Sequence, residues 1–174
     1  NKIETAKMEN IEIVKSNIKR INPYATILLA ASPISVEDEN KIKGKRVLVV
    51  EDGPTLTHGG MSYGAGIFAA KNFGAKEIID PRPFAVRSIS DTYKKYPNTG
   101  SLLPAMGYGE NQLRDLEETI ANIECDTVII GTPIDLRRVI KIKQDSVRVT
   151  YELDEKGEPS IKNILKEFIE KNKK

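Results

Sequence analysis

The chain reads RVLVVEDGPTLTHGGMSYGAGIFAAKNF from residue 46 to residue 73, and this stretch decides the fold. Its start, Arg46–Val50, is a β-branched run of the kind that is buried in a parallel sheet. Its end, Ala65–Phe73, is rich in small apolar residues that favour a helix packed closely on that sheet. Between them, residues 51–66 hold five of the twelve glycines and the only histidine. A glycine-rich turn from strand to helix leaves backbone N–H groups free, so it predicts a site for an anion such as phosphate.

Side chains suited to catalysis gather in the same connection, at the carboxyl end of a strand, where open α/β sheets build their sites. The candidate catalytic groups are two carboxylates and an imidazole, from Glu51, Asp52 and His58. The two carboxylates are also candidate ligands for Mg²⁺, and an imidazole is suited to moving a proton near neutral pH. Hydroxyl and backbone N–H groups are the candidate phosphate donors, from Thr55, Thr57, Gly59 and Gly60.

Ordinary structural roles explain the same residues. Glycines at such a turn allow a helix to pack tightly on a strand, carboxylates cap helices, and a lone histidine is often a hydrogen-bonded part of the structure. The glycine spacing fits neither the phosphate-binding loop G-x-x-x-x-G-K-[ST] nor the dinucleotide fingerprint G-x-G-x-x-G. Both interpretations therefore stay open at this point.

Outside this connection, the apolar spacing predicts strands that alternate with helices. Helical spacing marks residues 8–21, 86–93, 110–123 and 161–168, and short apolar runs mark residues 25–30, 77–79 and 127–130. Val147–Leu153 alternates apolar with polar residues, which predicts an edge strand. These elements predict an α/β fold of three layers, with a mostly parallel sheet and helices on both faces.

Length and composition exclude several classes of protein. At 174 residues and without an evident linker, the chain predicts a single domain over residues 1–174. Charged residues make up 30% but the net charge is only +2, so neither nucleic acid nor a membrane is expected as a partner. One cysteine, Cys125, excludes an internal disulfide, and with a single histidine it leaves zinc without a ligand set. Because no long apolar stretch or signal peptide is present, the cytoplasm is the expected location.

The segment Arg82–Gly109 is the least regular part of the chain, with several prolines and glycines. Long irregular connections in compact domains are typical of lids and binding loops. Two arginines in this segment, Arg82 and Arg87, are candidates for clamping a polyanionic substrate, because guanidinium groups bind phosphate in a forked geometry. Solvated surface arginines are the ordinary alternative.

Several short runs together resemble a known family. The runs VVEDGPTLTHGGM at 49–61, DPRP at 80–83, LPAMGYG at 103–109 and GTPIDL at 131–136 resemble the C-terminal half of the predicted-GTPase family that includes cyclic 2,3-diphosphoglycerate synthetase. The first four residues, NKIE, are similar to the N-K-x-D base-recognition motif of GTPases, with Glu in place of Asp. The run INPYATI at 21–27 is similar to the L-N-P-x-A-x-I element that follows this motif in metallochaperone-type GTPases.

The resemblance implies a fold like the C-terminal half of a P-loop NTPase or a Rossmann fold, and a nucleotide-binding protein that uses Mg²⁺ with GTP or ATP. The residues implied to contact the base are Asn1, Lys2 and Glu4. The family's P-loop region precedes this part of its chain, and no G-x-x-x-x-G-K-[ST] occurs here, so this chain is not expected to be active alone. Its first residue, Asn rather than Met, is interpreted as the mark of a C-terminal fragment.

Three functions follow as hypotheses. In the first, the chain contributes base recognition and a phosphate or acceptor site for phosphoryl transfer. In the second, it is a non-catalytic regulatory module that binds an anion or a nucleotide. In the third, it is a structural subunit interface, and a homo-oligomer stays open in each of them.

Overall fold

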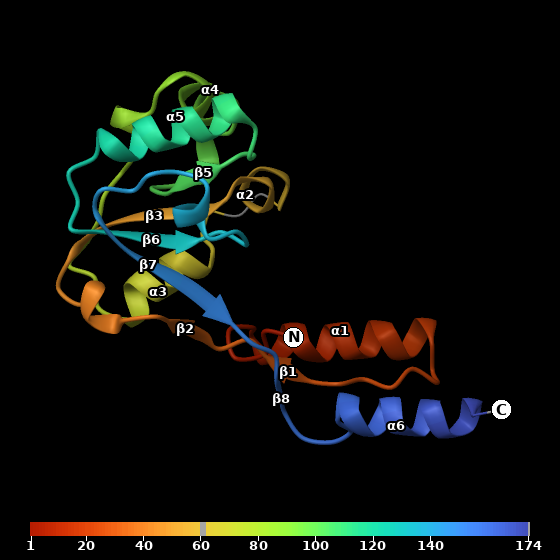
Figure 1. Cartoon of the computed structure of the whole chain (residues 1–174). Helices are drawn as coiled ribbons and strands as arrows, with labels where there is room; N and C mark the ends of the chain where they lie inside the picture. The colour runs from red at the N-terminus through yellow and green to blue at the C-terminus, as the bar shows by residue number, and fades with distance from the viewer. Residues whose placement is uncertain (60–61, 174) are drawn as a thin grey trace. The chain divides into compact units, whose positions relative to one another are not determined.

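The computed structural model describes residues 1–59 and 62–173, with residues 58 and 59 described by their backbone alone (Figure 1). The described chain forms two compact units. Unit 1 combines residues 1–33 with residues 151–174, and unit 2 consists of residues 34–150. The two units are described separately below.

Unit 2 is built on a mostly parallel sheet, which in the described chain has six strands. The strand order is β2-β7-β6-β3-β4, and β5 pairs with the later part of β3. The strands are β2 (Ile34–Val36), β3 (Arg46–Asp52), β4 (Glu77–Ile78), β5 (Leu103–Ala105), β6 (Thr127–Gly131) and β7 (Asp145–Tyr151). Strand β3 is parallel to β4, β5 and β6, so the β-branched run that opens the deciding stretch forms the centre of the sheet.

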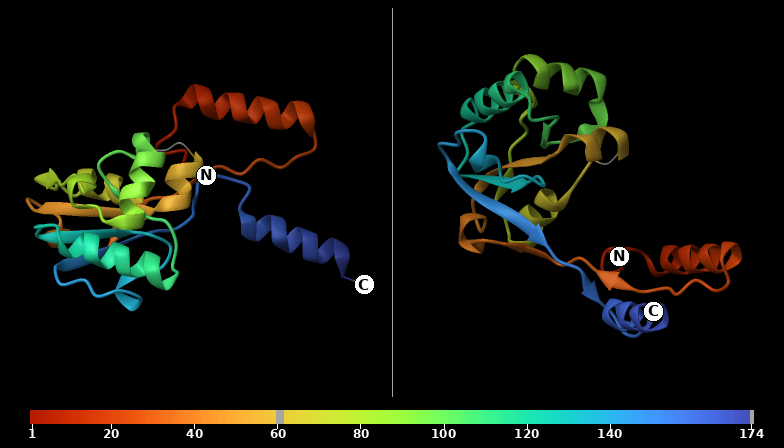
Figure 2. Two further views of the ribbon diagram at one scale, coloured as in Figure 1. Left: turned by 90° about the horizontal axis from the view of Figure 1, so that it is seen from above. Right: turned by 45° about the vertical axis from the view of Figure 1, so that its right-hand side comes forward.

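Helices cover both faces of this sheet, as Figure 1 and the right-hand view of Figure 2 show for α3 on one side and α4 with α5 on the other. Successive residues of β3 point to opposite faces, and each face has its own apolar core. Val47 and Val49 pack in one core with α3, whereas Leu48 and Val50 pack in the other with α4 and α5. The helices are α2 (Gly53–Gly59), α3 (Ala65–Asn72), α4 (Arg87–Lys95) and α5 (Glu110–Ala121). The predicted three-layer α/β fold is confirmed.

Two details of unit 2 differ from the sequence-based expectation. The connection after β3 is not a continuous turn, because its first part, Gly53–Gly59, is the helix α2. The predicted edge strand at 147–153 is wrong, because β7 lies between β6 and β2, and β2 forms the edge. Its alternating pattern has another cause: Val147 and Val149 enter one core, while Ser146 and Arg148 are less buried. Cys125 is partly buried, and burial raises the pKa of its thiol to about 11, as expected for an inert cysteine.

Unit 1 contains two helices and a short antiparallel ribbon. Its elements are α1 (Met8–Ile21), β1 (Ala30–Ala31), β8 (Asp154–Glu155) and α6 (Ile161–Asn172), with β1 paired to β8. Both helices are amphipathic, yet neither contains a buried residue. The side chain of Ile21 on α1 is 77% exposed and that of Phe168 on α6 is 64% exposed. Both described apolar cores belong to unit 2, so unit 1 leaves its apolar helix faces uncovered.

The prediction that no membrane span is present agrees with the described part of the chain. None of its helices combines the length and the apolar character that crossing a bilayer requires.

Candidate functional site

Three neighbouring strands of unit 2 end at one edge of the sheet, where the predicted catalytic carboxylates lie. In the register of the ladders, Glu51 on β3 lies beside Pro104 on β5 and beside Gly131 on β6. Asp52 is the next residue of β3, and α2 starts directly after it. The carboxyl ends of parallel strands are the usual place for ligand binding in α/β proteins, so this edge is the candidate functional site.

The Glu51 carboxylate is held in a cradle of glycines at the start of α3. Its side chain is almost fully buried, and its Oε1 accepts hydrogen bonds from the backbone N–H groups of Gly66 (2.8 Å) and Ile67 (3.1 Å). A Cβ atom on Gly64 or on Gly131 would lie only 2.5 Å from Oε2 of Glu51. The glycines therefore make room for this carboxylate, which occupies the anion-binding position at the N-terminus of α3.

Asp52 has a capping role at the start of α2. Its Oδ2 accepts hydrogen bonds from the backbone N–H of Thr55 (3.2 Å) and from the Thr55 hydroxyl (2.6 Å). The Thr57 hydroxyl donates to the carbonyl oxygen of Gly53 (3.0 Å) within the same helix. Burial and then the negative charge of Asp52 raise the pKa of Tyr108, which places that phenol near this edge.

The remaining predicted residues of this connection are only partly visible. Gly59 is the last residue of α2, while the side chain of His58 and the whole of Gly60 lie outside the described residues. Across residues 1–59 and 62–173, no group of three or more histidine, cysteine, aspartate and glutamate side chains is arranged to hold a metal. A magnesium site at Glu51 and Asp52 stays a prediction. Of the two, Asp52 is the more accessible, because Glu51 is turned onto the amides of α3.

Both predicted arginine clamps have acidic partners within the protein. Arg82 forms a forked pair with Asp80, with its Nε 2.9 Å from Oδ1, and this pair lowers the pKa of the Asp80 carboxyl. Arg87 donates from Nε to Oδ1 of Asp115 (2.7 Å) and also pairs with Glu118. Neither guanidinium group is unpaired in this arrangement, so an incoming polyanion must compete with these carboxylates.

The three residues predicted to contact a nucleotide base belong to unit 1. Lys2 has a left-handed backbone with φ of 61° within a short turn that also includes Ile3. Oε1 of Glu4 accepts a hydrogen bond from the backbone N–H of Ser32 (3.1 Å), directly after β1. This contact ties the NKIE run to the end of β1.

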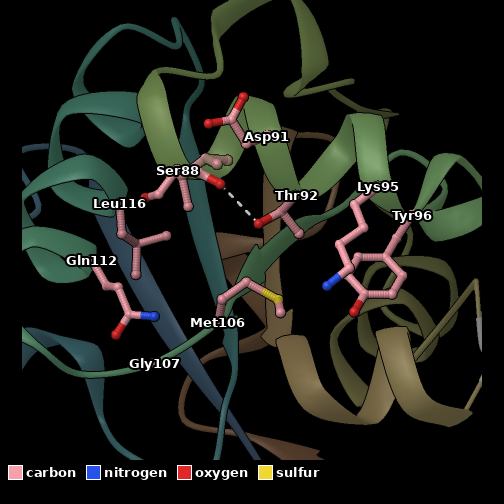
Figure 3. Close-up of a pocket in the computed structure, with 10 residues that line it drawn as sticks. Ser88, Asp91, Thr92, Lys95, Tyr96, Met106, Gly107, Gln112 and Leu116 are labelled. Atoms are coloured by element: carbon pink, nitrogen blue, oxygen red, sulfur yellow. Dashed lines mark hydrogen bonds between the residues drawn. The ribbon is translucent and has the colours of Figure 1, made fainter.

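Two cavities in unit 2 lie beside the carboxyl edge and were not predicted from the sequence. The larger, of about 340 Å³, lies between α4, α5 and the end of β5, and the smaller, of about 190 Å³, is lined by Leu56 and Thr57 of α2. Lys95 and Tyr96 line both cavities. Figure 3 shows their side chains pointing from the end of α4 toward α2. The only sequence signal for them was their position inside the irregular segment 82–109.

The comparisons with known proteins found a close relative of this chain. It is arginine synthetase ArcE of Thermococcus kodakarensis. The two chains are 60% identical over 168 residues, which is 97% of this chain but 38% of the relative, so the chain spans about two fifths of the relative's length. No family model and no solved structure matches the chain. The predicted relation to cyclic 2,3-diphosphoglycerate synthetase stays a prediction.

Proposed function

We propose that this chain is the C-terminal part of a nucleotide-dependent synthetase. Like its relative, the longer protein would form arginine. The supporting observation is the 60% identity to arginine synthetase ArcE over nearly the whole chain. Within the longer protein, the chain supplies base recognition and an acceptor site for phosphoryl transfer, and a P-loop outside this chain holds the nucleotide phosphates. The longer protein acts in the cytoplasm with Mg²⁺ and GTP or ATP.

Phosphoryl transfer is a chemically sufficient way to drive such a synthesis. The terminal phosphoryl group passes to an oxygen of the amino-acid precursor, which breaks its bond to the nucleoside diphosphate and forms a new P–O bond. A nitrogen nucleophile then attacks the activated carbon, and inorganic phosphate leaves with that oxygen. Because the transition state is stabilised mainly by positioning and charge neutralisation, the protein needs fixed donors and a cation more than a covalent nucleophile.

The carboxyl edge of the sheet has groups for these tasks. Asp52 would hold Mg²⁺, which neutralises phosphate charge when it is bound. The hydroxyl groups of Thr55 and Thr57 would donate to phosphate oxygens once their present partners are released. Glu51 keeps the start of α3 in place, because its carboxylate already accepts two backbone N–H groups. In unit 1, Asn1, Lys2 and Glu4 would contact the base.

The test compares two variants of Asp52 in the full-length protein. Asn can still cap α2 but carries no charge, whereas Ala removes both the cap and the charge. We expect Asp52→Asn to lower the rate of nucleotide-dependent arginine formation about a hundredfold or more, because it removes charge from the proposed metal ligand. Asp52→Ala should show the same loss of rate together with a free energy of unfolding lower by about 1 kcal/mol. Product formation by chromatography and urea denaturation measure the two effects.

The outcomes separate the proposal from a regulatory binding module. A wild-type protein that binds GTP or ATP in calorimetry but forms no arginine with either would favour the non-catalytic module. Full activity in Asp52→Asn would leave capping as the role of this residue and contradict its place in the chemistry.

A further inference from the structure

The larger of the two cavities beside the carboxyl edge is lined by polar side chains of one helix. It lies between α4 and α5, at the end of β5, and has a volume of about 340 Å³. Ser88, Asp91, Thr92 and Lys95 line it at positions i, i+3, i+4 and i+7, so one face of α4 is directed at the cavity. The Thr92 hydroxyl donates to the Ser88 carbonyl oxygen (2.8 Å), which keeps part of this wall in place, as Figure 3 shows.

Two charged residues are among the described residues that line the cavity. Lys95 contributes an ammonium group and Asp91, one turn earlier on α4, contributes a carboxylate. The Lys95 nitrogen lies 5.3 Å from the centre of the Tyr96 ring, and Asp91 pairs at 2.9 Å with Lys94, which is not part of the lining. The Asp91 carboxylate is mostly exposed, and Figure 3 shows it directed away from Lys95 and Met106. The Lys95 ammonium group suits one anionic group of a ligand, and inorganic phosphate would leave the apolar part of the lining unfilled.

The rest of the lining suits a flexible aliphatic chain that ends in a polar group. Ile89, Met106 and Leu116 provide apolar surface, and Gln112 provides an amide whose Oε1 accepts the backbone N–H of Gly109 (3.3 Å). Figure 3 shows Lys95 and Tyr96 at one end of the cavity, Gln112 at the other, and Met106 between them. The volume is at the small end of the range for ligand pockets, roughly 300–1,000 Å³, and fits a single amino acid.

The cavity also adjoins the candidate functional site. A Cβ atom on Gly53, the first residue of α2, would lie 2.5 Å from Sδ of Met106. Met106 therefore lies against Gly53, the residue that directly follows Asp52, and connects the cavity with the start of α2.

We infer that this cavity binds an amino acid with a long unbranched side chain, placing its α-carboxylate at Lys95. The apolar surface of Ile89, Met106 and Leu116 takes the methylene groups, and Gln112 meets the polar end of the side chain. The inference rests on the proposed function only for the choice of arginine as the ligand to be tested.

Titration of the ¹⁵N-labelled chain with L-arginine tests this inference without any nucleotide. We expect saturable shifts of amide resonances in α4 and α5, and affinity about tenfold weaker in Lys95→Ala, because a charge-assisted contact is lost. Lys94→Ala is the matched control, since this neighbouring exposed lysine does not line the cavity, and its affinity should stay within about twofold of wild type. Agmatine, which lacks the α-carboxylate, should bind weakly to wild type and be insensitive to Lys95→Ala.

Three results would overturn the inference. The first is the absence of saturable shifts at about 50 mM arginine, which corresponds to a binding free energy weaker than about 2 kcal/mol. The second is an affinity for inorganic phosphate equal to that for arginine. The third is an equal loss of affinity in Lys95→Ala and Lys94→Ala. Failure of the proposed function is a separate result. If arginine binds in this cavity but the full-length protein forms no arginine, the proposed function is contradicted and the binding site stands. If the full-length protein forms arginine but no arginine binds in this cavity, the binding site is contradicted and the proposed function stands.

Discussion

Replacing Gly131 with alanine is expected to lower the free energy of unfolding by about 3 kcal/mol, because it forces a buried carboxylate out of its place. The added Cβ would lie 2.5 Å from Oε2 of Glu51 and 3.1 Å from the backbone nitrogen of Gly66. Glu51 is buried at the end of β3 and cannot move outward without losing its two N–H donors at the start of α3. Urea denaturation followed by circular dichroism measures the loss.

A double substitution distinguishes this cause from a general weakening of β6. In Gly131→Ala with Glu51→Asp, the shorter carboxylate withdraws from the new methyl group. The two changes together should therefore cost less than the sum of their separate costs. Strict additivity would mean that the carboxylate is not the group displaced, and it would contradict the cradle as described.

Asp115→Asn is expected to cost about 2 kcal/mol at neutral pH and to make stability less sensitive to acid. Asp115 is a buried residue of α5 that accepts hydrogen bonds from the Ser88 hydroxyl (2.5 Å), from the Ser88 backbone N–H (3.2 Å) and from Arg87. The Ser88 hydroxyl, followed by Arg87, lowers the pKa of the Asp115 carboxyl from 3.8 to about 2. The carboxylate thus joins α5 to the first turn of α4.

The direction of the pH effect follows from this lowered pKa. The unfolded chain takes up the proton near pH 3.8 and the folded chain only near pH 2, so stability is complete above pH 3.8 and is lost between these values. In Asp115→Asn this loss is absent, and the stability curves of wild type and variant should converge as the pH falls through that window. Asp145→Asn, at the exposed start of β7, is the control and should keep the wild-type slope. Parallel curves for wild type and Asp115→Asn would contradict the assignment.

The central architecture was predictable because it depends on local periodicity. The run Arg46–Val50 has the β-branched character of a buried strand, and the apolar spacing in residues 8–21 gave the bounds of α1. The position of Val147–Leu153 in the sheet was not predictable in this way, because alternation reports which face is buried and not whether another strand pairs alongside. β2, which covers that side, is only three residues long and has little pattern of its own.

The candidate site was predicted in its location and less well in its contacts. Glycines and carboxylates after a buried strand were sufficient to indicate the carboxyl edge. The placement of Glu51 against Gly131 could not be read from the sequence, because these residues are far apart in the chain and meet only when β6 pairs with β3. Lys95 and Tyr96 were missed for a similar reason. Their link to α2 depends on how the segment after α4 folds back, which no local spacing reports.

The uncovered helices of unit 1 have a consequence for hydrogen exchange. The amphipathic helices α1 and α6 contain no buried residue, so their backbone hydrogen bonds are not protected by packing. In this chain, we expect the amide protons of α1 and α6 to be replaced by deuterium within the dead time of manual mixing, while those of β3 and β6 are retained far longer. Equal retention in α1 and β3 would show that the apolar face of α1 is shielded. Local opening in unit 1 thus takes place without any disruption of the sheet that carries the carboxyl edge.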